Sequence, residues 1–106
     1  MYRSFFDKAK RFGYAIYMPT IFRQNGFVVM IYLNDHTSAH VHVFKAEAEV
    51  IISLGNEATP PQVRENIGMS RRDERAALKI AGECQAVFWD EWRRIHGKGK
   101  DRSMGD

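Results

Sequence analysis

The sequence has very little cysteine and no long apolar run. Cys84 is the single cysteine among 106 residues, which excludes an internal disulfide and a disulfide-stabilised secreted scaffold. No apolar stretch approaches the roughly 18–20 residues that a membrane-spanning helix needs. The N-terminal region lacks the continuous apolar segment and the small-residue cleavage site of a signal peptide. These absences predict a cytoplasmic protein that does not bind a membrane.

Two motifs that mark common chemistries are also missing. Without a Gly-x-Ser-x-Gly sequence the chain has no nucleophile elbow, and without a Gly-rich loop it has no phosphate cradle of the usual kind. The net charge is +3, a mild excess that suits nucleic acid or an acidic protein as a partner and equally suits solubility alone. A length of 106 residues predicts one domain.

The chain divides into three parts. Residues 1–17 predict an N-terminal arm or short helix, because their aromatic and apolar side chains recur at helical spacing. Residues 18–97 predict a single α+β domain. Residues 98–106 are polar and rich in glycine, which is typical of a disordered tail.

The segment "PTIFRQNGFVVMIYL" predicts a β-hairpin. Asn25-Gly26, the pair favoured in a type I′ turn, separates two runs of β-favouring residues. The second run, residues 27–33, is apolar on both faces, so we expect a strand inside the sheet that is covered on both sides. One helix covers only one face, so the other cover would come from the N-terminal segment or from a second subunit in a homodimer.

Two more strands and a long helix complete the expected fold. Strands are predicted at residues 40–45 and 48–54, and "GNEATPPQ" then predicts a loop because its prolines cannot continue a central strand. A helix over residues 71–96 would begin after Ser70 and end at Gly97. Its expected apolar stripe comprises Leu78, Ile80, Ala81, Cys84, Val87, Phe88, Trp92 and Ile95. The fold class is α+β: a small antiparallel sheet of about four strands with one long C-terminal helix packed on it.

The segment "NDHTSAHVHVF" concentrates chemistry in a few positions. It holds three of the four histidines of the chain, His36, His40 and His42, together with Asp35. His40 and His42 alternate along the predicted strand and therefore point to one face. With His36 as a third ligand and Asp35 as a ligand or an orienting group, they could hold a divalent transition metal with an open position.

The same residues also suit metal-free catalysis. Two imidazoles can act as general base and general acid near neutral pH, and cleavage of RNA through its own 2′-hydroxyl needs such a pair and a cation. In this interpretation His40, His42, His36 and Asp35 are the catalytic residues. A third interpretation is a solvent-facing strand face without chemistry, with Asp35 and His36 in an ordinary turn.

Basic residues gather at the predicted start of the helix. "SRRDER" places Arg71, Arg72 and Arg75 beside exposed backbone N–H groups, and Lys45 ends the histidine strand. Such an arrangement can bind phosphate, so these four residues are the candidate nucleic-acid contacts. The alternative is a solvated charged face of mixed sign.

Three segments, "MPTIFRQNGF", "NDHTSAHVHVF" and "GMSRRDERAALKIAGECQAVFWDEW", resemble the small bacterial family called domain of unknown function 4160. The resemblance covers about residues 18–96 and is centred on an Asp-His-x-Pro-Pro-His-Val-His-Val motif. Ser38-Ala39 replaces the Pro-Pro pair here, which makes the loop that presents His36 less rigid. Residues 1–17 lie outside the resemblance.

The resemblance implies a partner and a role in an operon. Genes of this family commonly lie beside those of domain of unknown function 2442, in pairs resembling toxin–antitoxin modules. This implies a small protein that binds a cognate partner encoded by the neighbouring gene, with one of the two acting on RNA or DNA. Three functions follow as expectations: a toxin component acting on RNA, an antitoxin-like or regulatory module binding a partner protein or DNA, and a His-ligated metal-dependent hydrolase.

Overall fold

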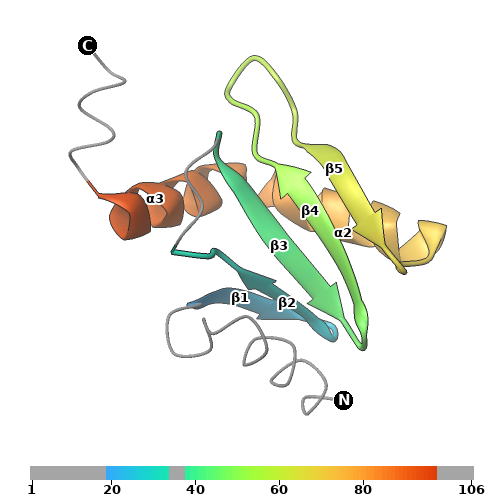
Figure 1. Ribbon diagram of the computed structural model, residues 1–106. Coiled ribbons are helices and arrows are strands. Elements are labelled where there is room, and N and C mark those ends of the chain that lie inside the picture. The colour runs from blue at the N-terminus through green and yellow to red at the C-terminus, as the bar shows by residue number, and fades with distance from the viewer. Residues whose placement is uncertain (1–18, 34–37, 98–106) are drawn as a thin grey trace.

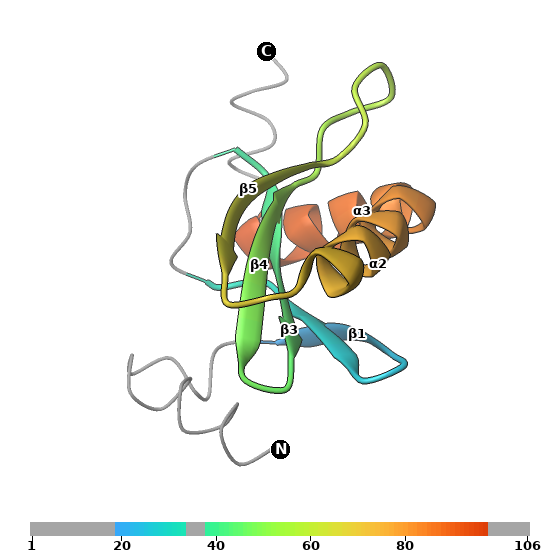
Figure 2. The same ribbon diagram turned by 90° about the vertical axis from the view of Figure 1, so that its right-hand side faces the viewer.

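The computed structural model describes residues 19–33 and 38–97 and shows a sheet with helices on one side (Figure 1). All neighbouring strands are antiparallel and follow the chain order β1-β2-β3-β4-β5. In both ribbon views the two helices cover the same face of the sheet (Figure 2). The elements are β1 (Thr20–Gln24), β2 (Phe27–Met30), β3 (His40–Lys45), β4 (Ala48–Ser53), β5 (Gln62–Ile67), α2 (Arg71–Glu83) and α3 (Gln85–His96).

The α+β class is confirmed, with differences in the number of elements. The expected hairpin forms around Asn25 and Gly26, whose φ angles of 51° and 84° fit the turn that this pair favours. β2 is buried along its whole length and lies between β1 and β3, as its two-sided apolar pattern indicates. The N-terminal arm, the tail at 98–106, Asp35 and His36 lie outside the described residues.

A fifth strand stands where about four strands were expected. β5 follows Pro61 and forms one edge of the sheet, pairing with β4 over Glu49↔Ile67 to Ser53↔Gln62. Most of its side chains are polar and exposed. Its sequence therefore carries no apolar alternation, and the strand forms because β4 offers it a hydrogen-bonding edge.

The core lies between the sheet and the helices. On the strand side it consists of residues that alternate toward the helices and are fully buried: Val29, Val41, Val43, Val50 and Ile52. On the helix side Ala77 and Ala81 of α2 and Phe88 of α3 are also at 0% exposure. Small residues on α2 let that helix lie close to the sheet, while α3 contributes the large rings.

The prediction of one long helix is wrong, because the helix is interrupted at Cys84. Cys84 has φ −108° and ψ 17°, and it serves both as the C-cap of α2 and as the N-cap of α3. Just after it, the Gln85 side-chain amide donates to the Leu54 carbonyl at 2.7 Å, which ties the start of α3 to the end of β4. The predicted ends are confirmed: the Ser70 hydroxyl caps α2, and Gly97, with φ 89°, follows α3.

The turn between β3 and β4 contains a strained residue. Lys45 pairs with Ala48, so Ala46 and Glu47 form a two-residue turn, and Ala46 has φ 54°. A side chain in this left-handed region is disfavoured, whereas glycine adopts it freely. We expect Ala46→Gly to raise the free energy of unfolding by about 0.5–1 kcal/mol in urea denaturation. The control, Ala48→Gly in the adjoining strand, should lower it; a loss of stability in both variants would contradict the prediction.

No helix in the described residues is both long and apolar enough to cross a membrane.

Candidate functional site

His40 and His42 lie on β3, on the face of the sheet turned away from α2. The register pairs His42 with Met30 on one side and with Ile51 on the other, and it pairs His40 with Ser53. Their exposed fractions are only 4% and 6%. The interpretation of these residues as a solvent-facing strand face is therefore wrong, because neighbouring groups enclose both rings.

A buried carboxylate orients His42. Nδ1 of His42 lies 2.8 Å from Oε2 of Glu49, which is itself 6% exposed. A carboxylate only accepts, so Nδ1 carries the proton, and in the neutral ring Nε2 is left as the basic nitrogen. This is the arrangement by which a carboxylate fixes the tautomer of a catalytic histidine.

Glu49 was not among the predicted site residues, although the strand register indicates its position beside His42. The two-residue turn at 46–47 pairs Phe44 with Glu49 and His42 with Ile51. Glu49 is thus the diagonal neighbour of His42 on the same face, within reach of a long side chain. A charged residue in the otherwise apolar strand "AEVIIS", read in this register, points to the pair.

His40 is oriented by the backbone and is linked to an arginine. Its Nδ1 lies 2.8 Å from the carbonyl oxygen of Ser38, and the Ser38 hydroxyl accepts a hydrogen bond from Arg64 at 3.2 Å. Ser38 therefore connects β5 to the start of β3. Arg64 was not predicted, because β5 itself was not.

Aromatic rings join the two histidines to α3. Tyr32 stacks on His42 with ring centroids 3.7 Å apart and an interplanar angle of 2°. The row continues from His42 to His40 at 5.2 Å, from His40 to Trp92 at 5.4 Å and from Trp92 to His96 at 3.9 Å. Such packing holds both imidazoles in fixed orientations, which pre-organises a site.

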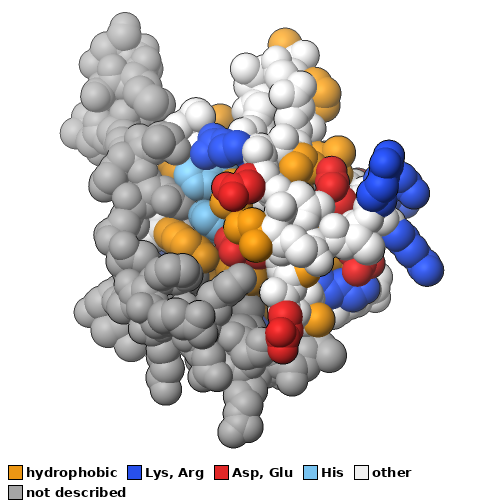
Figure 3. Space-filling view, turned by 45° about the vertical axis from the view of Figure 1, so that its right-hand side comes forward, with side chains coloured by type: hydrophobic (Ala, Val, Ile, Leu, Met, Phe, Trp, Pro, Cys, Tyr) orange, Lys and Arg blue, Asp and Glu red, His pale blue; other side chains and the backbone are white. Residues whose placement is uncertain are grey.

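The predicted phosphate contacts lie elsewhere. Lys45 lies on the helix-covered face, where its ammonium group bonds Asp73 at 3.3 Å and lies 4.8 Å from the ring centre of Phe27. The arginines predicted with it, Arg71, Arg72 and Arg75, are exposed at the start of α2. In Figure 3 the pale-blue histidine side chains are well separated from the largest group of basic side chains. The structure therefore does not bring these four residues together with the histidines.

Metal ligation would have to use particular atoms. Because both Nδ1 atoms face oxygen acceptors, His40 and His42 could bind a metal only through Nε2. A carboxylate behind a histidine, as Glu49 is behind His42, also occurs around metal-ligating histidines. Within residues 19–33 and 38–97 no three His, Cys, Asp or Glu side chains gather in a metal-binding group. His36 and Asp35, the other predicted ligands, lie outside the described residues.

Cys84 is not set up as a nucleophile. Burial, and after it the negative charge of Glu83, raises the pKa of the Cys84 thiol. A raised pKa lowers the thiolate fraction at any given pH, and the thiolate is the reactive form. We expect Cys84 to react with a disulfide reagent more slowly than glutathione does at pH 8, with the rate still rising above pH 9. A rate equal to that of glutathione at pH 8 would contradict this assignment.

Comparison with known proteins identifies the family of the chain. A search of curated proteins and a search of solved structures each found no match. A family model described as "Domain of unknown function (DUF4160)" matches residues 26–93, a range that includes β2 to β5, α2 and most of α3. The chain therefore belongs to the DUF4160 family, as its three segments indicated.

Proposed function

We propose that the protein is the RNA-cleaving component of a toxin–antitoxin module and that His40 and His42 are its acid–base pair. The observation that carries the proposal is the pair of adjacent imidazoles whose Nδ1 atoms both face protein oxygens. With Nδ1 engaged, proton exchange with a substrate would run through the two Nε2 atoms. Histidine is the side chain best suited to such exchange near neutral pH.

The chemistry follows from the partner of each ring. His42, backed by the Glu49 carboxylate, removes the proton of a 2′-hydroxyl, and the carboxylate stabilises the imidazolium that forms. The 2′-oxygen attacks phosphorus, and a 2′,3′-cyclic phosphate forms. The P–O5′ bond breaks as His40, in its protonated form, donates a proton to the leaving oxygen. Arg64, linked to His40 through Ser38, supplies positive charge near the phosphate.

Both histidines of the proposed pair are recessed. Histidine side chains form part of the surface seen in Figure 3, although each of the two rings keeps only a few per cent of its area exposed. A recessed site suits a flexible single strand better than a rigid duplex. His36 and Asp35 remain in the proposal as further residues of the site.

Induced expression in a bacterial host tests the proposal. Wild-type protein should arrest growth and fragment total RNA, whereas His40→Ala/His42→Ala should do neither, and co-expression of the neighbouring gene should relieve the arrest. The matched control is His96→Ala, which removes the histidine at the far end of the ring row and should remain toxic. The separate variants His40→Gln and His42→Gln, whose folding is checked by circular dichroism, cover the case in which the double variant unfolds. Arrest by folded His40→Gln and His42→Gln proteins would refute the assignment.

A non-catalytic module is the second candidate, and the burial of the histidines favours it. Histidines that are 4% and 6% exposed within an aromatic row can serve packing alone. Such an antitoxin-like or regulatory module would bind a partner protein or DNA, or pair with a second copy of itself. It would cause no growth arrest, and light scattering would show a dimer or a complex with the product of the neighbouring gene.

A metal-dependent hydrolase is distinguished by metal content. The carboxylate behind His42 fits this function as well as it fits acid–base catalysis. Elemental analysis of untagged protein should show no stoichiometric transition metal, and chelation with EDTA should leave RNA cleavage unchanged. Cleavage that EDTA abolishes and zinc restores would replace the acid–base mechanism with the metal mechanism.

A further inference from the structure

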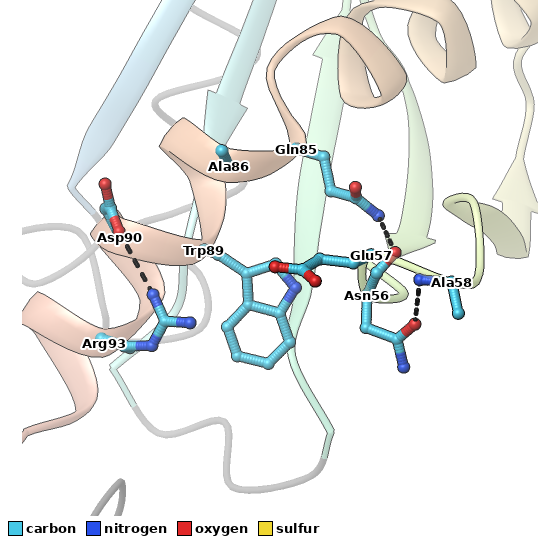
Figure 4. Close-up of a pocket in the computed structure, with 8 residues that line it drawn as sticks. All are labelled: Asn56, Glu57, Ala58, Gln85, Ala86, Trp89, Asp90 and Arg93. Carbon is cyan, nitrogen blue, oxygen red and sulfur yellow. Dashed lines mark hydrogen bonds and ion pairs between the residues drawn. The ribbon is translucent and has the colours of Figure 1, made fainter.

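A second candidate site lies at the start of α3, built from the loop after β4 and one face of the helix (Figure 4). The indole of Trp89 extends from α3 toward the loop, with Arg93 on one side and Asn56 on the other. The residues that line the pocket are Asn56, Glu57, Ala58, Gln85, Ala86, Trp89, Asp90 and Arg93. The proposed RNA chemistry uses none of them.

Several hydrogen bonds fix the walls of this pocket. The indole N–H of Trp89 donates to the Gly55 carbonyl at 2.8 Å, which sets the plane of the ring. The Gln85 amide donates to the carbonyls of Leu54, Asn56 and Thr59 at 2.7, 3.0 and 3.2 Å, so the loop is closed against the helix. A pocket held in this way does not have to be ordered when a ligand binds, which favours affinity.

Only glycine fits at the first residue of the loop. Gly55 has φ 68°, and a Cβ placed there would lie 2.3 Å from the Thr59 carbonyl oxygen. The Asn56 side-chain oxygen accepts from the backbone N–H groups of Ala58 and Thr59 at 2.8 and 2.9 Å. The tight turn therefore presents Glu57 at its exposed tip beside the indole.

The net charge of the pocket has the opposite sign to the net charge of the chain. Glu57 and Asp90 are its acids and Arg93 is its one base, which leaves one negative charge in excess on a chain whose net charge is +3. Asp90 is paired with Arg93 at 3.2 Å, whereas Glu57 has no ion-pair partner among the described residues. A phosphate would be repelled here, and a cation would be attracted.

The structure already shows how the indole receives a cation. The guanidinium carbon of Arg93 lies 5.0 Å from the centre of the Trp89 ring, which is a cation–π contact, and Asp90 neutralises the guanidinium. The electron-rich indole, with Glu57 as a second carboxylate, offers the same combination to a guanidinium from outside.

We propose that this pocket binds an arginine side chain presented by a partner protein. The guanidinium would stack on Trp89 and pair with Glu57. The ligand class follows from the ring and the carboxylates together, since a guanidinium is planar, charged and readily stacked on aromatic faces. This site is independent of the histidines and of the RNA chemistry proposed for them.

The test follows the indole N–H signals of the two tryptophans by NMR, with Trp89 assigned from Trp89→Phe. The probe is the peptide acetyl-Gly-Arg-Gly-amide, and its citrulline analogue is the uncharged control. The arginine peptide should move the Trp89 signal and leave that of Trp92 in place. Glu57→Gln should weaken binding about threefold. Glu47→Gln, which removes an exposed acid from the β3–β4 turn, should leave binding unchanged.

Two results would overturn the proposal. Equal binding of the citrulline peptide would show that the pocket does not recognise the charge. A decauridylate RNA that moves the Trp89 signal when the arginine peptide does not would assign the pocket to nucleic acid. Neither result depends on whether His40 and His42 cleave RNA, so this proposal and the proposed function fail separately.

Discussion

Phe88→Ala is expected to lower the free energy of unfolding by about 3–5 kcal/mol. Phe88 is completely buried between α3 and the sheet, and its ring meets that of Phe22 on β1 edge to face, with centroids 5.6 Å apart. Removing the ring takes away a large buried apolar surface and leaves a cavity that the surrounding strands fill only in part. Small domains have about 5–15 kcal/mol of stability in total, so the variant should be near the limit of folding.

The neighbouring residue provides the control. Val87 is 54% exposed, so Val87→Ala should change the free energy of unfolding by no more than about 0.5 kcal/mol. Urea denaturation of the wild type and both variants, followed by circular dichroism, measures both effects. Similar losses for the two variants would mean that α3 is rotated about its axis relative to the structure.

The contrast between these two residues shows what the sequence could not decide. Phe88 and Val87 were both expected in the apolar stripe of one helix, and that stripe ran unbroken through Cys84. The interruption at Cys84 depends on contacts with a distant loop, namely Gln85 with Leu54 and Trp89 with Gly55. Local periodicity contains no information about contacts that span some thirty residues, so the break could not be predicted.

Local rules predicted other parts of the fold well. Asn25-Gly26 determined the first hairpin because few residue pairs adopt two positive φ angles at low cost. The third strand was predicted at residues 40–45, and the structure places it at His40–Lys45, because alternation and β-branched residues agree there. β5 lacks both signals, since its residues are mostly polar, and it owes its conformation to the free edge of β4.

In the candidate site, too, local sequence rules predicted some residues and missed those that depend on strand pairing. His40 and His42 were predicted to share a face from the period of a strand alone, and they do. Glu49 depends on the register between two strands, and Arg64 on a strand that was not expected. Lys45 was grouped with the histidines by nearness in sequence, but alternation places it on the opposite face from His42.

Glu49→Gln is the second prediction with a large expected effect, and it rests on the proposed function. The amide keeps the shape of the side chain, and its oxygen can still accept from Nδ1 of His42, but the negative charge is lost. Without that charge the imidazolium formed during the reaction is not stabilised. The rate of RNA cleavage should fall by about 10²–10⁴-fold, while the affinity for RNA stays the same.

A split between kcat and KM separates this role from a purely structural one. If Glu49 only supported packing, Glu49→Gln would lower thermal stability and leave the kcat of the folded fraction intact. If it orients and stabilises His42, kcat falls and KM does not, and the melting temperature changes by a few degrees at most. Glu47→Gln removes an equal charge from the exposed turn two residues earlier and should leave kcat, KM and stability unchanged. Because Glu49 is buried against His42 and Glu47 is exposed, a loss of kcat confined to Glu49→Gln would be due to the buried carboxylate and not to a general loss of negative charge.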